Sequence, residues 1–315
     1  MDLLCTAALA LFLITLATAY AYRVARSGRA RHARIDRDGG SPLLGQRAME
    51  MGYWAMLPVG RACVAFGVRA DAVSWTALAL AAAAAAALAA GRFGVGAALF
   101  ALSSICDGID GMVARESGTA SRSGEILDAA VDRYAELFVF GALAVQERHS
   151  APALVLVLAA TTGAIMVSYA SAKAEALSSG AARASTPRGI MRRQERAVYL
   201  VLGAALVPIL AAAGMPAWFE RAPLYVSLAM VALLGNGSAI RRLGALGHAT
   251  DCTDRGGDTD TNLRFDADGQ ADAKLRAEAQ NRADANLRAE AQSADAEGKA
   301  EAASLRRKAR GSRVA

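Results

Sequence analysis

The stretch CDGIDGMVARESGTASRSGEILDAAVDRYAE occupies residues 106–136 and contains four aspartates. Asp107 and Asp110 are three residues apart, and Asp128 and Asp132 are four residues apart. Residues three or four apart share one face of an α-helix, so each pair of carboxylates projects from one side of its helix. If the two faces meet, the sequence predicts a cluster of four carboxylates.

Long apolar segments lie on both sides of this acidic stretch. They approach the roughly 17 to 25 residues that cross a hydrocarbon core as a helix. They also lack the turn signals every 8 to 12 residues or so that short strands would need. We therefore predict an all-α integral membrane protein. The approximate segments are residues 3–22, 73–90, 95–113, 129–145, 153–172, 197–213 and 223–237.

The distribution of arginine predicts which side of the membrane the acidic stretch faces. Short cytoplasmic loops hold the excess of Lys and Arg. Six arginines follow the first segment between residues 23 and 37, and Arg115, Arg122 and the 183–196 segment fall on the same side when the segments are counted through. We expect the acidic site to face the cytoplasm. The first segment lacks the basic n-region of a signal peptide and a cleavage site followed by a soluble mature domain. We therefore expect it to be a retained transmembrane anchor and not a cleaved signal peptide.

The energetic cost of placing several carboxylates together in a membrane protein indicates what they bind. Carboxylates at membrane depth are expensive, and several together repel one another unless cations join them. Oxygen ligands suit Mg²⁺ or Mn²⁺, which usually keep substrate phosphates as further ligands. Gly108 and Gly111 allow close approach to the backbone, and the planar fork of Arg115 fits phosphate. A phosphate-bearing substrate is implied. The four cysteines show no spacing typical of a disulfide framework or zinc site.

The complete pattern resembles the signature of the CDP-alcohol phosphatidyltransferase family. It reads D-x-x-D-G-x-x-A-R, eight residues, then G-x-x-x-D-x-x-x-D. The resemblance implies a six-helix membrane core, here preceded by one extra N-terminal transmembrane helix. It also implies transfer of a phosphatidyl group from a CDP-lipid to a polar alcohol, with release of CMP, in phospholipid biosynthesis. The matching residues are Asp107, Asp110, Gly111, Ala114, Arg115, Gly124, Asp128 and Asp132.

The resemblance implies a role for each residue of the motif. Asp107, Asp110 and Asp128 would hold Mg²⁺ or Mn²⁺, with Asp132 completing the metal cluster and serving as general base. The residues expected to contact the CDP moiety are Gly111, Ala114, Arg115 and Ser74. Ser74 stands where the family has the hydroxyl residue of a P-N-x-x-S/T pattern, but Ala70 and Asp71 replace the Pro and Asn. That departure weakens any nucleotide contact by Asp71.

Basic residues of two later segments are candidates for binding the acceptor alcohol. They are Lys173, Arg193 and Arg196, and the last two lie in a stretch similar to the R-x-E-R element of the branch that uses inositol phosphate. Arginines bind phosphate well, although anchoring at the cytoplasmic surface would also place them there. Glycerol phosphate is the alternative acceptor, but the Arg-Glu element of that branch is not evident after Thr161. Members of the family are commonly homodimers.

The composition divides the chain into three parts. Residues 1–44 form the anchor and a basic linker, and residues 45–242 form the membrane domain, which opens with an amphipathic surface helix within 49–67. Residues 243–315 are polar and Ala-rich and repeat LRAEAQ, so we predict a cytoplasmic tail that is disordered or partly helical.

Two other functions use intramembrane carboxylates. Membrane prenyltransferases use Asp pairs and magnesium with diphosphate substrates, but they would not need the G-x-x-A-R element. A cation transporter would bind ions in transit, but Arg115 beside the site would repel them. We expect no nucleic-acid partner. A CDP-lipid, a small polar alcohol and membrane lipids are the predicted partners.

Overall fold

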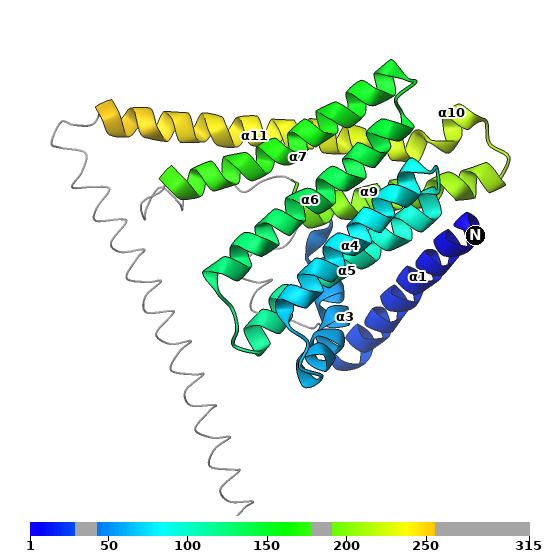
Figure 1. Ribbon diagram of the computed structural model, residues 1–315, viewed down its shortest axis with the longest axis horizontal. Coiled ribbons are helices and arrows are strands. Elements are labelled where there is room, and N and C mark those ends of the chain that lie inside the picture. Colours follow the sequence, from blue (N-terminus) through cyan, green and yellow to red (C-terminus); the bar gives the residue numbers. More distant parts are fainter. Residues whose placement is uncertain (29–42, 178–190, 256–315) are drawn as a thin grey trace, which may run out of the picture. The chain divides into compact units, whose positions relative to one another are not determined.

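A computed structural model describes residues 1–28, 43–177 and 191–255, and within these residues every regular element is an α-helix (Figure 1). The helices are α1 (Asp2–Ser27), α3 (Gly45–Ala65), α4 (Ala70–Ala89), α5 (Phe93–Glu116), α6 (Arg122–Gln146), α7 (Ala151–Leu177), α9 (Arg193–Ala212), α10 (Ala217–Glu220) and α11 (Ala222–Arg255).

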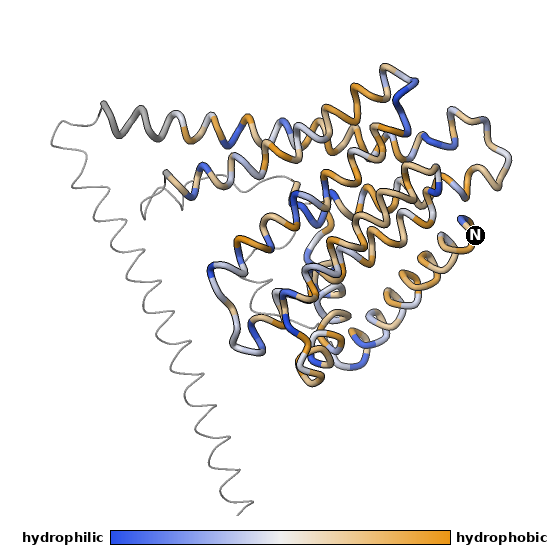
Figure 2. The backbone as a smooth tube through the Cα atoms, viewed as in Figure 1, coloured by the Kyte–Doolittle hydropathy of each residue, from blue (hydrophilic) through white to orange (hydrophobic). Residues whose placement is uncertain are grey.

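Each of the seven apolar segments forms a helix, which confirms the all-α prediction. Within the described residues, six helices are long and apolar enough to cross a membrane, namely α1, α4, α5, α7, α9 and α11. The chain is therefore a multi-pass membrane protein. The exception among the seven is α6, which has enough length but too many charged residues. Figure 2 shows hydrophobic residues along most of the helices, whereas hydrophilic residues interrupt α6 in its N-terminal half.

The alanine-rich α4 packs through one stripe of small residues. Ala77, Ala81, Ala84 and Leu88 are at most 2% exposed and recur at helical spacing. In lipid, where burial of apolar surface does not drive helices together, small side chains let backbones approach closely. α4 accordingly contacts both α5 and α6. This packing sets the two motif-bearing helices against a common neighbour.

α7 and α11 meet through glycines. A Cβ on Gly163 would lie 2.9 Å from Nδ2 of Asn236, and a Cβ on Gly235 would lie 3.1 Å from the backbone of Gly163. Nδ2 of Asn236 also donates to the carbonyl oxygen of Ala159 at 2.9 Å. Such a side-chain bond across two helices stabilises their contact within a membrane.

A helix is present where the surface helix was predicted, as α3 with Pro58 inside it, and its position at the membrane surface stays a prediction. α11 continues to Arg255, so the helix extends beyond residue 242, where the sequence suggested the membrane domain would end. The predicted tail from residue 256 onward lies outside the described residues, as do the arginines of the 29–37 and 183–188 segments.

Candidate active site

The connection between α5 and α6 places the motif on two neighbouring helices. Gly118 has a φ of 67°, a left-handed conformation that glycine adopts without strain and that ends the first helix sharply. Ser121 then begins α6, because its Oγ accepts a hydrogen bond from the backbone N–H of Gly124 at 3.1 Å. Ser121 is therefore the N-cap of α6, and Asp128 lies within the helix, after its first turn.

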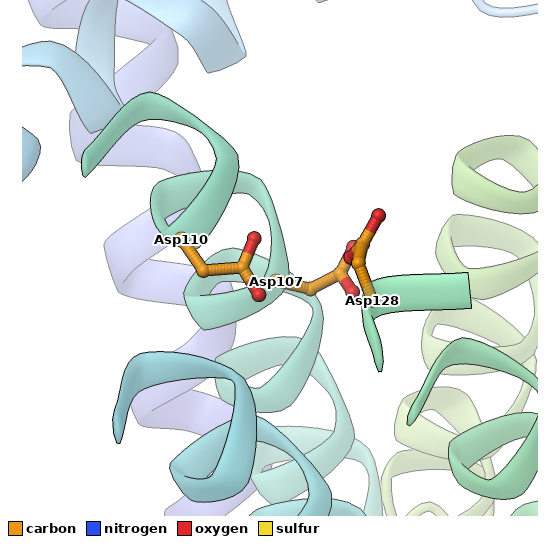
Figure 3. Close-up of side chains that lie close together, drawn as sticks. All are labelled: Asp107, Asp110 and Asp128. Carbon is orange, nitrogen blue, oxygen red and sulfur yellow. The ribbon is translucent and has the colours of Figure 1, made fainter. Parts of the chain in front are cut away.

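Three carboxylates converge from the two helices, as Figure 3 shows. One oxygen each from Asp107 and Asp110 of α5 and from Asp128 of α6 lie within 4.8 Å of one another. Oδ1 of Asp107 is buried and accepts no hydrogen bond from the described residues. A buried, unpaired carboxylate oxygen beside two further carboxylates needs a cation, so this set of oxygen donors fits Mg²⁺ or Mn²⁺.

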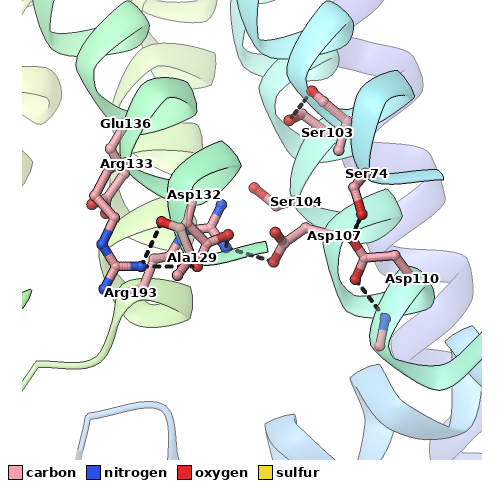
Figure 4. Close-up of polar contacts among 12 residues, drawn as sticks. Ser74, Ser103, Ser104, Asp107, Asp110, Ala129, Asp132, Arg133, Glu136 and Arg193 are labelled. Carbon is pink, nitrogen blue, oxygen red and sulfur yellow. Dashed lines mark hydrogen bonds and ion pairs between the residues drawn. The ribbon is translucent and has the colours of Figure 1, made fainter. Parts of the chain in front are cut away.

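Asp110 is oriented by two donors. Oγ of Ser74, on α4, donates to Oδ2 of Asp110 at 2.6 Å, and both residues are buried. The backbone N–H of Gly111 donates to Oδ1. The 2.6 Å distance from Oγ of Ser74 to Oδ2 of Asp110 is typical of a hydrogen bond to an ionised acceptor. Ser74, which the sequence assigned to the CDP moiety, therefore holds a candidate metal ligand in this structure (Figure 4).

Arg193 joins the cluster from α9. Its Nη1 donates to Oδ2 of Asp107 at 2.6 Å and forms an ion pair with Oδ1 of Asp132. Figure 4 shows the Arg193 guanidinium beside both carboxylates. Asp132 thus falls outside the group of three converging carboxylates and pairs with an arginine instead. Of the predicted metal set, Asp107, Asp110 and Asp128 converge on one point, and Arg193 connects Asp132 to this group through Asp107.

A second ion pair lies one turn further along the same two helices. Nε and Nη2 of Arg196 each donate to Glu136 at 2.9 Å, and the Arg196 side chain is 1% exposed. Glu136 thereby forms a contact between α6 and α9. One donor of Arg196, Nη1, has no hydrogen-bond partner among the described residues. The predicted acceptor contact of Arg196 depends on that nitrogen alone.

The remaining predicted residues differ in how closely they approach the cluster. A Cβ on Gly111 would lie 3.1 Å from Nη1 of Arg115, so this guanidinium lies over the glycine. Ala114 follows on the same helix, one turn after Asp110. Lys173 is exposed near the end of α7, and its acceptor role stays a prediction.

Sequence reasoning missed the cross-helix contacts of Ser74 and Arg193 with the carboxylates. It also missed Glu195, which is 1% exposed and accepts from the backbone N–H groups of Arg192, at 2.6 Å, and Leu43, at 3.2 Å. The spacing of Glu195 from Arg192 was a detectable signal, because a Glu at the third helical position commonly closes a capping box. This cap fixes the start of α9 and hence the position of Arg193.

Comparison with known proteins gives a family match in this region. The family model described as CDP-alcohol phosphatidyltransferase matches residues 68–235, which include all of the motif and both ion pairs. A relative from Rubrobacter xylanophilus, named bifunctional IPC transferase and DIPP synthase, is 38% identical over 178 residues. That match covers 56% of this chain but only 36% of the relative.

Two further similar proteins carry the name phosphatidylinositol phosphate synthase. The phosphatidylinositol phosphate synthase of Mycolicibacterium smegmatis is 33% identical, with 47% of this chain and 67% of the relative covered. The phosphatidylinositol phosphate synthase of Mycobacterium tuberculosis, solved with manganese and citrate, has a TM-score of 0.51 at 24% identity and covers 60% of this chain and 88% of its own. A second structure of that protein has CDP-DAG bound. The structural likeness shows that the fold is shared.

Proposed function

This chain belongs to the CDP-alcohol phosphatidyltransferase family, and from that premise we propose that it transfers a phosphatidyl group from a CDP-lipid to a polar alcohol and releases CMP. The observation that carries the proposal is the convergence of Asp107, Asp110 and Asp128 within 4.8 Å at the end of two helices. The chemistry implied by the motif needs those three carboxylates together, and they come from positions up to 21 residues apart in the chain.

We propose that Asp107, Asp110 and Asp128 hold Mg²⁺ or Mn²⁺. A bound divalent cation would neutralise charge on the diphosphate and stabilise the leaving CMP. Manganese in the Mycobacterium tuberculosis relative supports the choice of metal class. Ser74 and the backbone of Gly111 would keep Asp110 in a fixed orientation. Gly111, Ala114 and Arg115 would lie along the CDP moiety.

In the proposed reaction the acceptor hydroxyl oxygen attacks the phosphorus that carries the lipid. The bond from that phosphorus to the oxygen bridging to CMP breaks, and the hydroxyl proton passes to Asp132. Asp132 has a partner in Arg193 that holds its carboxylate in place. A phosphate on the acceptor would compete for Arg193, because phosphate oxygens pair strongly with guanidinium. Arrival of the acceptor would then free Asp132 to take the proton.

Inositol phosphate is the acceptor that we propose. Two kinds of observation support it: relatives are named phosphatidylinositol phosphate synthase, and Arg193 is positioned beside the cluster where an anionic acceptor would arrive. Glycerol phosphate also carries a phosphate and is the alternative. Lys173 would add to the phosphate contacts, and a contact by Arg196 would require its buried Nη1 to become accessible. We further propose that the site faces the cytoplasm, that residues 45–242 form the catalytic domain and that the protein is a homodimer.

The test is CMP release by the purified full-length protein in detergent. The donor is CDP-diacylglycerol, the metal is Mn²⁺ or Mg²⁺, and the acceptors are inositol phosphate, inositol, glycerol phosphate and serine. We expect CMP release that requires both metal and acceptor and is fastest with inositol phosphate, and Asp107→Asn serves as the inactive control. Faster release with another acceptor would discard inositol phosphate and keep the transferase. No CMP release with any of the four would contradict the proposal.

A further inference from the structure

Two helices outside the matched residues 68–235, α1 and α3, contact each other through a buried polar pair. The hydroxyl of Tyr20, on α1, donates to Oε2 of Glu50, on α3, at 3.1 Å. Tyr20 is 6% exposed and Glu50 is fully buried. A buried carboxylate is costly unless it is hydrogen-bonded. A buried, hydrogen-bonded carboxylate on this amphipathic helix therefore indicates that α3 takes one specific position against α1, and that the contact is more than general apolar packing.

Aromatic contacts reinforce the pair. Trp54 lies one turn after Glu50 on the same face of α3, and its ring centroid is 5.7 Å from that of Tyr20. The guanidinium carbon of Arg23 lies 5.8 Å from the Trp54 centroid, which is a cation–π distance. Tyr20, Arg23, Glu50 and Trp54 are called the N-terminal clamp below.

The opposite end of α1 is attached directly to the start of α5. Oδ1 of Asp2 accepts a hydrogen bond from the backbone N–H of Val95 at 2.8 Å. At Gly94 there is no room for a Cβ, because the carbonyl oxygen of Asp2 and the hydroxyl of Thr6 occupy the space. α1 is thus held at both ends, by α5 at its beginning and by α3 at the clamp.

α3 in turn presses on α5 at the motif itself. A Cβ on Gly108, which lies between Asp107 and Asp110, would be 2.8 Å from Sδ of Met56. A Cβ on Gly60 would be 2.5 Å from Sδ of Met112. Met56 of α3 therefore packs on Gly108 of α5, and Met112 of α5 packs on Gly60 of α3. Together the two contacts hold α3 against α5 on both sides of Asp110. Close-packed contacts of this kind can carry a small shift of α3 to the segment of α5 that bears Asp107 and Asp110.

We propose that the N-terminal clamp positions the acidic cluster. Tyr20 and Glu50 set the placement of α3, and α3 sets the placement of Asp107 and Asp110 through Met56 and Gly60. These residues act through others and touch neither substrate nor metal. The proposal rests on the proposed function only for its turnover readout, because the placement of the carboxylates is also measured by metal binding alone.

The test compares Tyr20→Phe and Glu50→Gln in the full-length protein, with Tyr22→Phe as the matched control. Tyr22 is on the same helix and 60% exposed, so it loses the same hydroxyl without touching the clamp. Mn²⁺ binding is measured by loss of the free-ion EPR signal. Residues that directly support metal ligands change affinity by about 10- to 100-fold. The clamp is several contacts away from the ligands, so we expect a smaller effect, a weakening of Mn²⁺ binding by about fivefold. Turnover should fall with the CDP-lipid KM nearly unchanged, and Tyr22→Phe should behave as wild type.

A second variant, Gly60→Ala, tests the contact between α3 and α5 and still decides whether the clamp acts through α3 if Tyr20→Phe does not fold. Gly60→Ala should push Met112 away and weaken Mn²⁺ binding, and Gly60→Ala/Met112→Ala should restore it because the space is reopened. Wild-type Mn²⁺ affinity in Tyr20→Phe, or in Gly60→Ala, would overturn the proposal. If the wild-type protein binds Mn²⁺ but releases no CMP, the proposed function fails while the EPR comparison still judges the clamp.

Discussion

Replacing Ser74 with alanine separates two roles for this residue. Its Oγ donates to Oδ2 of Asp110 at 2.6 Å, and a hydrogen bond to a charged acceptor contributes about 1.5 to 3 kcal/mol. Each 1.4 kcal/mol corresponds to about tenfold in affinity, so the loss is at most about 100-fold. Because the backbone N–H of Gly111 still holds the other oxygen, we expect Ser74→Ala to weaken Mn²⁺ binding by about tenfold, the lower end of that range.

The assay titrates Mn²⁺ twice, once by EPR without substrate and once by CMP release at saturating CDP-diacylglycerol. Both half-saturation values should rise together, while the KM for CDP-diacylglycerol at saturating Mn²⁺ stays within about twofold of wild type. Ser103→Ala is the matched control, because Ser103 is also buried but donates to the carbonyl oxygen of Ala77. A raised KM for CDP-diacylglycerol with unchanged Mn²⁺ binding would refute the reasoning and return Ser74 to the CDP moiety.

Four other outcomes are expected. Asp107→Asn, Asp110→Asn and Asp128→Asn each remove one candidate metal ligand and should each abolish nearly all CMP release. Near wild-type turnover in any two of them would count against the metal assignment. Asp132→Asn should stop turnover while CDP-lipid binding, measured by calorimetry, largely survives. Arg193→Ala should raise the inositol phosphate KM by about tenfold or more, and an equal rise for CDP-diacylglycerol would mean that it shapes the whole site. Glu136→Ala leaves the buried Arg196 charge without its partner and should lower the free energy of unfolding by about 3 to 5 kcal/mol, whereas an unchanged thermal midpoint would show that the pair is dispensable.

The helical fold and the acidic motif could be predicted because both depend on local spacing. The separation of Asp107 from Asp110, and of Asp128 from Asp132, fixes the face of each helix whatever the rest of the chain does. The assignment of seven helices needed only the length of the apolar runs. α6 is the one of the seven that is too charged to count among the six apolar helices, and its charged residues include Asp128 and Asp132 of the site.

The partners of these carboxylates could not be predicted, because they come from distant positions. Ser74 is 36 residues before Asp110, and Arg193 is 86 residues after Asp107. Helical periodicity gives no information about which faces of two such helices meet. The R-x-E-R stretch likewise gave no indication that Glu136 pairs with Arg196, and the predicted acceptor contact of Arg196 stays a prediction. A role inferred from residue type alone misses a counter-charge supplied by another helix.

The two ion pairs between α6 and α9 have a consequence for how the protein enters the membrane. Asp132 and Glu136 lie within α6, where each charged residue near the middle of a helix opposes insertion by about 2.5 to 3.5 kcal/mol. Their partners, Arg193 and Arg196, belong to a helix that the ribosome completes later. During synthesis α6 is therefore complete before Arg193 and Arg196 can pair with its acidic face, and among the described residues only Asp132 of these two carboxylates pairs with an arginine of α6 itself, Arg133 at 3.6 Å. The arginines that complete the site would then also favour stable insertion of α6, so Arg193→Ala should be checked for correct insertion before its KM is interpreted.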